Sequence, residues 1–258
     1  MTAERRAHPT ILRGLVVLEK VVQARRPVSA TELIEELELP KPTVNRILQQ
    51  LEDQGLLQRE PVNRRYLPGA RTRQIALGVM SNTALGAPRH AILKALSEEI
   101  GETCNCALLD GDHTVYFDRV EANWPFRIQL PIGTQLPLHC TASGKLFLAY
   151  MESRQRQRLL GAAPLKRFTD RTITDIEQIS TELKRIEKEG IGVDNEEFMA
   201  GMAAVAVPVL TPANSICFTV AVHAPAVRKP LAALRQYVPA LRQAAAAMAA
   251  TYCDAEEA

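Results

Sequence analysis

The most informative part of the chain is LELPKPTVNRILQQLEDQGLLQRE, residues 37–60. Apolar residues recur through it at helical spacing, which predicts a helix over residues 41–54. Gly55 supplies the left-handed residue that closes this helix. A short basic hairpin over residues 56–67 is expected to follow directly. A helix that leads at once into a hairpin is one part of a larger motif, which the residues ahead of it complete.

Two further helices are predicted ahead of this stretch. Apolar residues at helical spacing indicate a helix over residues 10–23, which Pro27 ends. Ser29, followed three residues later by Glu32, forms a capping box and marks the start of a second short helix. Three short helices followed by a basic hairpin are the plan of a winged helix-turn-helix domain, which we expect over residues 1–69.

The start of the third helix carries side chains that are suited to reading DNA. Helix-turn-helix proteins place the first residues of the second helix of the pair against base edges in the major groove. Lys and Arg reach phosphate or guanine, Asn pairs with adenine, and Thr contacts a thymine methyl group. Arginines at a wing tip meet phosphate or enter the minor groove. The residues expected to contact DNA are Lys41, Pro42, Thr43, Asn45, Arg46, Arg64 and Arg65.

Charge is distributed unevenly along the 258 residues, a length natural for two domains. Residues 1–75 hold 13 Lys or Arg and 9 Asp or Glu, a net charge of +4, whereas residues 76–258 hold 18 and 20, a net charge of −2. This modest excess agrees with a polyanion as partner of the first third, although charge alone does not establish it.

The compartment follows from what the sequence lacks. No run approaches the roughly 20 apolar residues that a membrane helix needs, and the N-terminus has no signal-peptide core. The five cysteines have no regular spacing, which argues against a disulfide framework. We therefore expect a cytoplasmic protein with no membrane partner.

The remainder of the chain alternates strands and helices. A helix over residues 70–81 leaves the wing, residues 82–88 form a break, and we place a linker at 70–85 and a second domain at 86–258. Helices are predicted at 88–100, 142–151, 175–189 and 231–251, and strands at 103–109, 114–120, 191–194, 203–210 and 216–223. Strands flanked by helices, with hairpins between them, predict an α+β domain around an antiparallel sheet.

Residues 12–69 resemble the winged-helix half of the IclR family of bacterial transcription regulators. The resemblance is carried by GLVVLEKVV, by the stretch quoted above and by the wing NRRYLPG. It continues to about residue 230 through GETCNCALLDGDHTVYFDRVE, PIGTQLPLHCTASGKLFLA, KEGIGVDNEEFMAGMAAVAVPV and VAVHAPAVR. Pro42 departs from the family, which usually has a small hydroxyl residue there. Proline suits an early helix position, but it removes one possible phosphate contact.

The resemblance implies a sequence-specific DNA-binding regulator without a cofactor. Its C-terminal, GAF-like domain would bind a small organic acid that controls promoter occupancy. Free N–H groups at the start of the helix after residue 141 would form a site for a carboxylate. Carried over position by position, the implied effector contacts are Ile128, Leu136, Ala142, Ser143, Asp194, Met202, Ala204, Ala221 and His223.

Three of these positions depart from the more polar residues that the family uses. Ala204 and Ala221 cannot hydrogen-bond through their side chains, so we expect a roomier and less polar pocket than one built for a two-carbon acid. His223 brings an aromatic, titratable donor, although a histidine that points outward from its strand is the other interpretation. These features favour a hydroxylated aromatic acid and a role in aromatic catabolism.

Some of these residues also occur in two other classes of protein. Ser143, Lys145, His139 and Cys140 include catalytic residue types, but no nucleophile elbow, S-x-x-K motif or phosphate loop accompanies them, so we do not expect an enzyme. The alternative is a metal- or redox-responsive regulator whose soft ligands would come from Cys104, Cys106, Cys140, Cys217, His113, His139 and His223. No paired C-x-x-C is present, so buried cysteines in an apolar core are the simpler interpretation.

A single winged helix buries too little surface for tight, specific binding. Proteins with two-fold symmetry read pseudo-palindromic sites in double-stranded DNA. We therefore expect a homodimer or homotetramer, in which the apolar side of the helix at 70–81 pairs with its copy. Repressor and activator both remain open.

Overall fold

The computed structural model describes residues 10–24, 26–60, 63–80, 83–125, 130–212 and 214–253. Contacts divide the chain into two compact units, residues 1–80 and 81–258. Residues 70–80, which we predicted as part of a linker, are grouped with the first unit, and the predicted domain limits stay a prediction. Within the described residues, no helix is long and apolar enough to cross a membrane.

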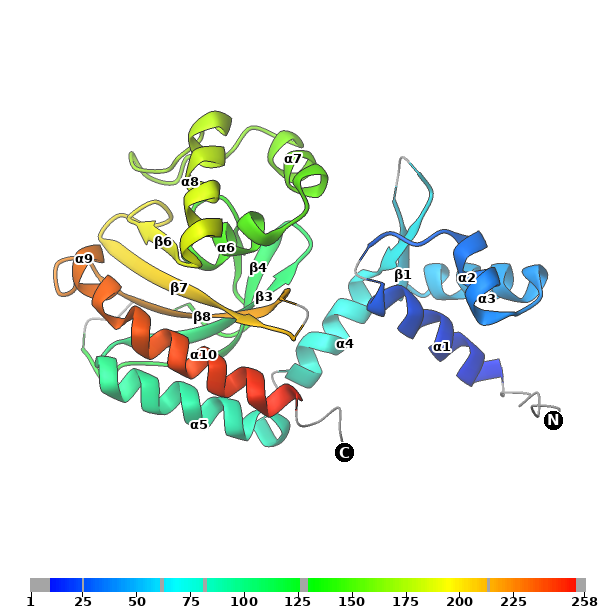
Figure 1. Cartoon of the computed structure of the whole chain (residues 1–258), viewed down its shortest axis with the longest axis horizontal. Helices are drawn as coiled ribbons and strands as arrows, with labels where there is room; N and C mark the ends of the chain where they lie inside the picture. Colours follow the sequence, from blue (N-terminus) through cyan, green and yellow to red (C-terminus); the bar gives the residue numbers. More distant parts are fainter. Residues whose placement is uncertain are drawn as a thin grey trace. The chain divides into compact units, whose positions relative to one another are not determined.

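The first unit confirms the predicted order of three helices and a hairpin (Figure 1). The hairpin strands pair antiparallel, and Gly55 closes the third helix with a φ of +68°. The backbone N–H of Ser29 donates to the Glu32 carboxylate at 2.7 Å, and the Ser29 hydroxyl accepts from the Glu32 N–H at 3.2 Å, which is the predicted capping box. The elements are α1 (Thr10–Gln23), α2 (Ala30–Leu37), α3 (Lys41–Asp53), β1 (Leu57–Arg59), β2 (Tyr66–Pro68) and α4 (Ala70–Met80).

A small apolar core holds the helices of the first unit together. Val17 of α1, Leu33 of α2 and Leu48 of α3 are fully buried in it, next to Leu57 of the hairpin. Because one face of α3 packs in this core, the opposite face of α3 lies on the surface.

The second unit is built on one antiparallel sheet, as predicted. The strand order is β5-β4-β3-β8-β7-β6. The first strand of the unit, β3, and its last strand, β8, are therefore neighbours at the centre of the sheet. The strands are β3 (Thr103–Asp110), β4 (His113–Val120), β5 (Gln135–Pro137), β6 (Gly192–Asn195), β7 (Met202–Leu210) and β8 (Ile216–Pro225). The helices are α5 (Thr83–Ile100), α6 (Ala142–Tyr150), α7 (Ser153–Gly161), α8 (Ile176–Glu189), α9 (Leu231–Leu234) and α10 (Val238–Cys253), with a 3₁₀ turn at Arg235–Tyr237.

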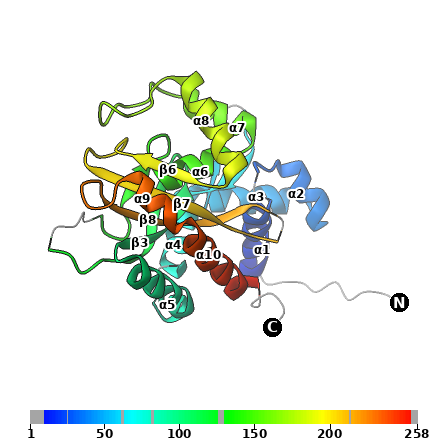
Figure 2. The ribbon, with the colours of Figure 1, turned by 60° about the vertical axis from the view of Figure 1, so that its left-hand side comes forward.

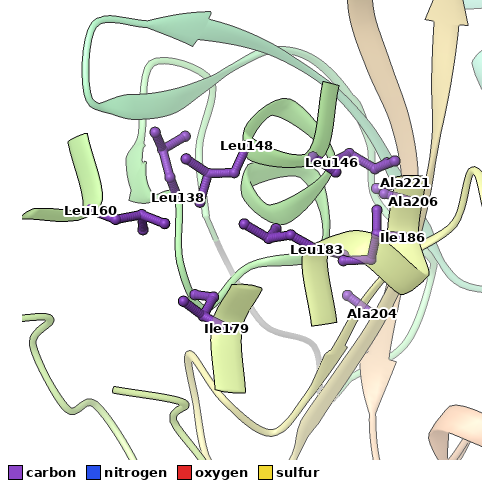
Figure 3. Close-up of a cluster of buried hydrophobic side chains, with 12 residues drawn as sticks. Leu138, Leu146, Leu148, Leu160, Ile179, Leu183, Ile186, Ala204, Ala206 and Ala221 are labelled. Carbon is purple, nitrogen blue, oxygen red and sulfur yellow. The ribbon is translucent and has the colours of Figure 1, made fainter. Parts of the chain in front are cut away.

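Helices cover both faces of this sheet. α5 and α10 lie side by side on one face, whereas α6 packs on the other face with α8 against it (Figures 1 and 2). The apolar cluster beneath α6 joins Leu146 of α6 and Ile186 of α8 to alanines of the sheet (Figure 3). The α+β class is therefore confirmed.

Two predicted details of the second unit are wrong, and two of its elements were not predicted. The break expected over residues 82–88 is helical from Thr83 onward, and Pro88 lies inside this helix. The fixed φ of proline is compatible with a helix, although its missing N–H costs one hydrogen bond. The single helix expected over 231–251 is interrupted, because Pro239 cannot continue a helix from the preceding turn. β5 and α7 were not predicted, since β5 has three residues and the sequence of α7, SRQRQRLLG, has no apolar period.

Candidate functional site

A cavity lies between the sheet and the first turn of α6. The enclosed space measures about 20 Å³. Its wall combines the centre of the sheet with the turn that follows β6. The lining residues are Asn105, Tyr116, Leu136, Thr141, Ala142, Ser143, Asp194, Phe198, Met202, Ala204, Ala221 and His223.

The structure brings eight of the nine expected effector contacts to this one cavity. The ninth, Ile128, lies outside the described residues. Four lining residues were missed by sequence reasoning: Asn105, Tyr116, Thr141 and Phe198. Thr141 had a usable signal, because a threonine just before an apolar helix is a favoured N-cap. Asn105 had none, because it reaches the cavity only through the pairing of β3 with β8, where it lies opposite Ala221.

The start of α6 provides the positive end of the cavity. Thr141 is the N-cap, and its hydroxyl accepts from the Gly144 N–H at 3.2 Å. The N–H groups of Ala142 and Ser143 belong to the first helical turn, which has no intrahelical acceptors for them. Backbone N–H groups and the helix dipole together favour an anion at this place.

Two glycines let the backbone close around this helix start. A Cβ atom at Gly192 would lie 2.1 Å from the Ala142 carbonyl oxygen, so β6 can approach α6 only with glycine there. A Cβ atom at Gly144 would lie 2.5 Å from the Cα of Leu138. Both contacts fix the first turn of α6 against the sheet.

Asp194 lies across the cavity from these amides and is 1% exposed. Its Oδ1 accepts from the backbone N–H of Glu197 at 2.7 Å and from that of Phe198 at 3.4 Å. Its Oδ2 is buried and has no hydrogen-bond partner among the described residues. Burial raises the pKa of Asp194 to about 7, with a further contribution from the nearby Glu197 carboxylate. Near neutral pH this carboxyl group can therefore either donate or accept a hydrogen bond.

Three polar side chains complete the wall of the cavity. The Asn105 side-chain nitrogen lies 3.1 Å from Nδ1 of His223. Burial raises the pKa of Tyr116, so its hydroxyl stays a donor at neutral pH. His223 is 3% exposed and lines the cavity, which makes the alternative of an outward-pointing histidine wrong.

The structure has a small cavity where we predicted a roomy and weakly polar pocket, and the size of the pocket around a bound acid stays a prediction. Ala204 and Ala221 belong to the apolar cluster under α6, so their small side chains let helices pack closely on the sheet (Figure 3). A cavity that admits benzene measures about 150 Å³, whereas this one measures about 20 Å³ and half of its lining residues are polar. Leu146 of α6 belongs to the same apolar cluster as these two alanines.

The residues expected to contact DNA share the surface face of the first unit. Lys41, Pro42, Asn45 and Arg46 are exposed and Thr43 is half-buried, while Val44, Ile47, Leu48 and Leu51 bury the opposite face of α3. At the wing, Arg64 is exposed with a φ of +52°. Arg65 is half-buried and donates to the Pro27 carbonyl at 3.4 Å. Of the two wing arginines, Arg64 is thus the one presented to solvent.

The catalytic-type residues are engaged in separate contacts. The Ser143 hydroxyl accepts from the Thr219 hydroxyl at 2.9 Å, and the Lys145 ammonium lies 2.5 Å from Glu197. Nε2 of His139 lies 2.9 Å from the Lys166 carbonyl oxygen. These contacts pair no nucleophile with a base.

Three of the cysteines behave as buried apolar residues, whereas Cys217 is half-buried. Cys104, Cys106 and Cys140 are fully buried, and burial raises the pKa of each thiol. Across the described part of the chain, no three His, Cys, Asp or Glu residues come together as a metal site.

Comparison with known proteins agrees with both units. Residues 10–61 match the model of the IclR helix-turn-helix domain, and residues 77–250 match that of the bacterial transcriptional regulator IclR C-terminal domain. A probable transcriptional regulator, SauR, of Cupriavidus necator is 44% identical over 243 residues, which cover 94% of this chain and 96% of that one.

Solved structures of similar proteins share the fold. The Thermotoga maritima IclR structure covers 93% of this chain and 97% of its own, with a TM-score of 0.62 and 27% identity. A double mutant of the PobR inducer-binding domain from Acinetobacter, in complex with 3-hydroxybenzoic acid, covers 62% of this chain and 94% of its own, with a TM-score of 0.57 and 25% identity.

The two units together define a DNA-binding transcription regulator with a C-terminal effector domain. The chain belongs to the IclR family of bacterial transcriptional regulators.

Proposed function

We propose that the chain binds a pseudo-palindromic operator as a homo-oligomer, and that a short organic acid in the cavity of the second unit controls how much of the operator is occupied. The observation that carries the effector part is the juxtaposition of the α6 N-terminus with the unpartnered Oδ2 of Asp194 inside one small cavity. A buried polar atom without a partner is costly, and a ligand that bonds to it removes that cost.

The arrangement of donors supports a specific orientation of the acid. The ligand carboxylate accepts from the N–H groups of Ala142 and Ser143, where the helix dipole favours negative charge. A hydroxyl or keto oxygen on the neighbouring carbon then lies toward Asp194 or Tyr116, both of which line the cavity. The small volume and the polar lining favour a two- to four-carbon hydroxy or keto acid.

An aromatic acid is the second candidate, because a relative was crystallised with 3-hydroxybenzoic acid. For a ring to enter, side chains that line this cavity of about 20 Å³ would have to move. The sequence-based preference for an aromatic acid thus stays a prediction that a binding screen decides.

Isothermal titration calorimetry with glycolate, glyoxylate, pyruvate, lactate, benzoate and 4-hydroxybenzoate separates the candidates. We expect heat from at least one short acid and none from the benzoates. Heat from the benzoates alone supports the aromatic candidate, and no heat from any acid contradicts the effector part of the proposal. We also expect the bound acid to be recovered unchanged after hours with the protein, as for a regulator rather than an enzyme.

Exposed apolar side chains support pairing of subunits through the first unit. Ile75 and Val79 of α4 are 55% and 52% exposed, and Ile11 of α1 is 80% exposed. Apolar side chains of this size rarely gather on a monomer's surface without a partner. Light scattering on the purified chain, and the number of chains bound per operator, test this part. One chain per operator contradicts it.

A further inference from the structure

Lys145 is fully buried next to the cavity but does not line it. It lies in the first turn of α6, the same turn whose N–H groups face the cavity, and its side chain is 0% exposed. Burying an ammonium group is strongly unfavourable unless the charge is paired and hydrogen-bonded. The partner of Lys145 therefore indicates what this charge holds in place.

That partner is Glu197, in the turn between β6 and β7. Nζ of Lys145 lies 2.5 Å from Oε1 of Glu197, whose side chain is 7% exposed. A second carboxylate, Glu182 of α8, lies 3.5 Å away and is itself paired with Arg185. The Lys145–Glu197 ion pair thus ties the start of α6 to the turn after β6.

The backbone of Glu197 makes contacts that also lead to the cavity. Its N–H donates to Oδ1 of Asp194 at 2.7 Å, and the next residue, Phe198, lines the cavity. Its carbonyl oxygen accepts from the hydroxyl groups of Thr169 at 3.2 Å and Thr172 at 2.6 Å. Glu197 therefore connects Asp194 and Phe198 to α6 through its side chain, and to the loop before α8 through its carbonyl oxygen.

We infer that Lys145 is a positioning residue for effector binding, whose ion pair with Glu197 holds Asp194 and Phe198 at a fixed distance from the α6 amides. The inference rests on the proposed function, because the acid must contact the α6 amides and Asp194 at the same time. Without the ion pair, the turn at 194–198 loses its side-chain link to α6. The acid then contacts the α6 amides in a defined position, but Asp194 and Phe198 are no longer held in place.

The same pair sets the charge around Asp194. The ionisable groups that act on Asp194 or on its neighbour Glu197 are Lys145, Glu182, Tyr116 and Cys140, in addition to these two carboxyls themselves. The Lys145 charge lowers the pKa of Asp194, so removing it moves the titration of that carboxyl to higher pH. The pH at which effector affinity changes should move upward with it.

Amide hydrogen exchange tests the positioning role without any ligand. In Lys145→Met we expect the N–H groups of Glu197 and Phe198 to lose about 10-fold or more protection, because their acceptor Asp194 is no longer held. The amides of Val205 and Val222, paired in the middle of the sheet, should keep theirs. Lys184→Met, the same change at an exposed position of α8, is the control and should alter neither pair. Equal loss at all four amides would mean a general stability role and would overturn the inference.

Calorimetry with the six acids named above supplies the second readout. Lys145→Met should weaken the tightest of them by about 10-fold or more, shift the pH profile of its Kd upward, and leave operator affinity without acid unchanged. If Lys145→Met does not fold, the neutral pair Lys145→Met/Glu197→Gln replaces it, and acid binding equal to that of the unchanged chain overturns the inference. If no acid binds the unchanged chain, the proposed function fails, while the exchange result still decides the role of Lys145.

Discussion

Most of the charged residues proposed to bind DNA are exposed in the first unit, whereas the charged groups of the candidate effector site are buried in the second unit. On α3, Lys41 and Arg46 stand on a polar surface above a small apolar core. In the second unit, Lys145, Asp194 and Glu197 are all at least nine-tenths buried. An exposed cation is always charged and meets its partner through long-range attraction. A buried carboxyl group instead changes its charge with pH and with its neighbours, so a small ligand can alter it. The comparison agrees with the proposed division, in which the first unit binds DNA and the second unit binds an acid.

The largest effects are expected from substitutions in the apolar cores of the two units, which should change the unfolding free energy of one unit at a time. Leu146→Ala should lower the unfolding free energy of the second unit by about 2–5 kcal/mol, because it removes a fully buried side chain from a packed cluster. Leu48→Ala should do the same to the first unit. Calorimetry and residue-level hydrogen exchange follow the two units separately. If each variant lowers both transitions equally, the units do not unfold independently.

The buried Asp194 should make the stability of the second unit depend on pH. Its folded pKa of about 7 lies above the ordinary 3.8, so its stabilising effect is full at low pH and is lost as pH rises through 7. Asp194→Asn should therefore be more stable than the unchanged chain above neutrality, by on the order of 4 kcal/mol. Denaturant unfolding at about pH 5 and about pH 8 measures the difference. Asp112→Asn removes a 73% exposed carboxyl group and keeps Asp194, so it is the control and should keep the pH dependence of the unchanged chain.

On the exposed side, Arg46→Ala should weaken operator binding by about 1–3 kcal/mol and relax sequence preference at one position, if Arg46 reads a base. Binding to a set of operators, each altered at one base pair, measures this. An equal loss on every sequence would assign Arg46 to the phosphate backbone instead.

The smallest effect is expected at the wing. Arg64→Ala should weaken all sequences about equally and reduce the slope of log affinity against log salt by about 0.9, because one phosphate contact is lost. Arg65→Ala serves as the comparison, since Arg65 is half-buried and already donates to Pro27. A larger change in slope for Arg65 than for Arg64 would reverse this assignment.

Local patterns made the first unit predictable, because a helical period, a capping box and a glycine cap each involve neighbours in the sequence. In the second unit, the helix start at Ala142 and the buried Asp194 came from the family resemblance. Asn105 and Tyr116 were not predictable, since they reach the cavity only when β3 pairs with β8 and β4. The size of the cavity was not predictable for a similar reason: the sequence does not show whether the volume that an alanine leaves is empty or occupied by a side chain from another element.

The central claim is that an acid bound between the α6 amides and Asp194 controls operator occupancy. Fluorescence anisotropy of a labelled operator, titrated with glycolate and with pyruvate, measures this for the unchanged chain and for Asp194→Ala. We expect at least one acid to change occupancy, and Asp194→Ala to need about 10-fold or more acid for half of the effect while binding the operator equally well without it. Occupancy that neither acid alters, or a half-effect concentration that Asp194→Ala leaves unchanged, would contradict the account.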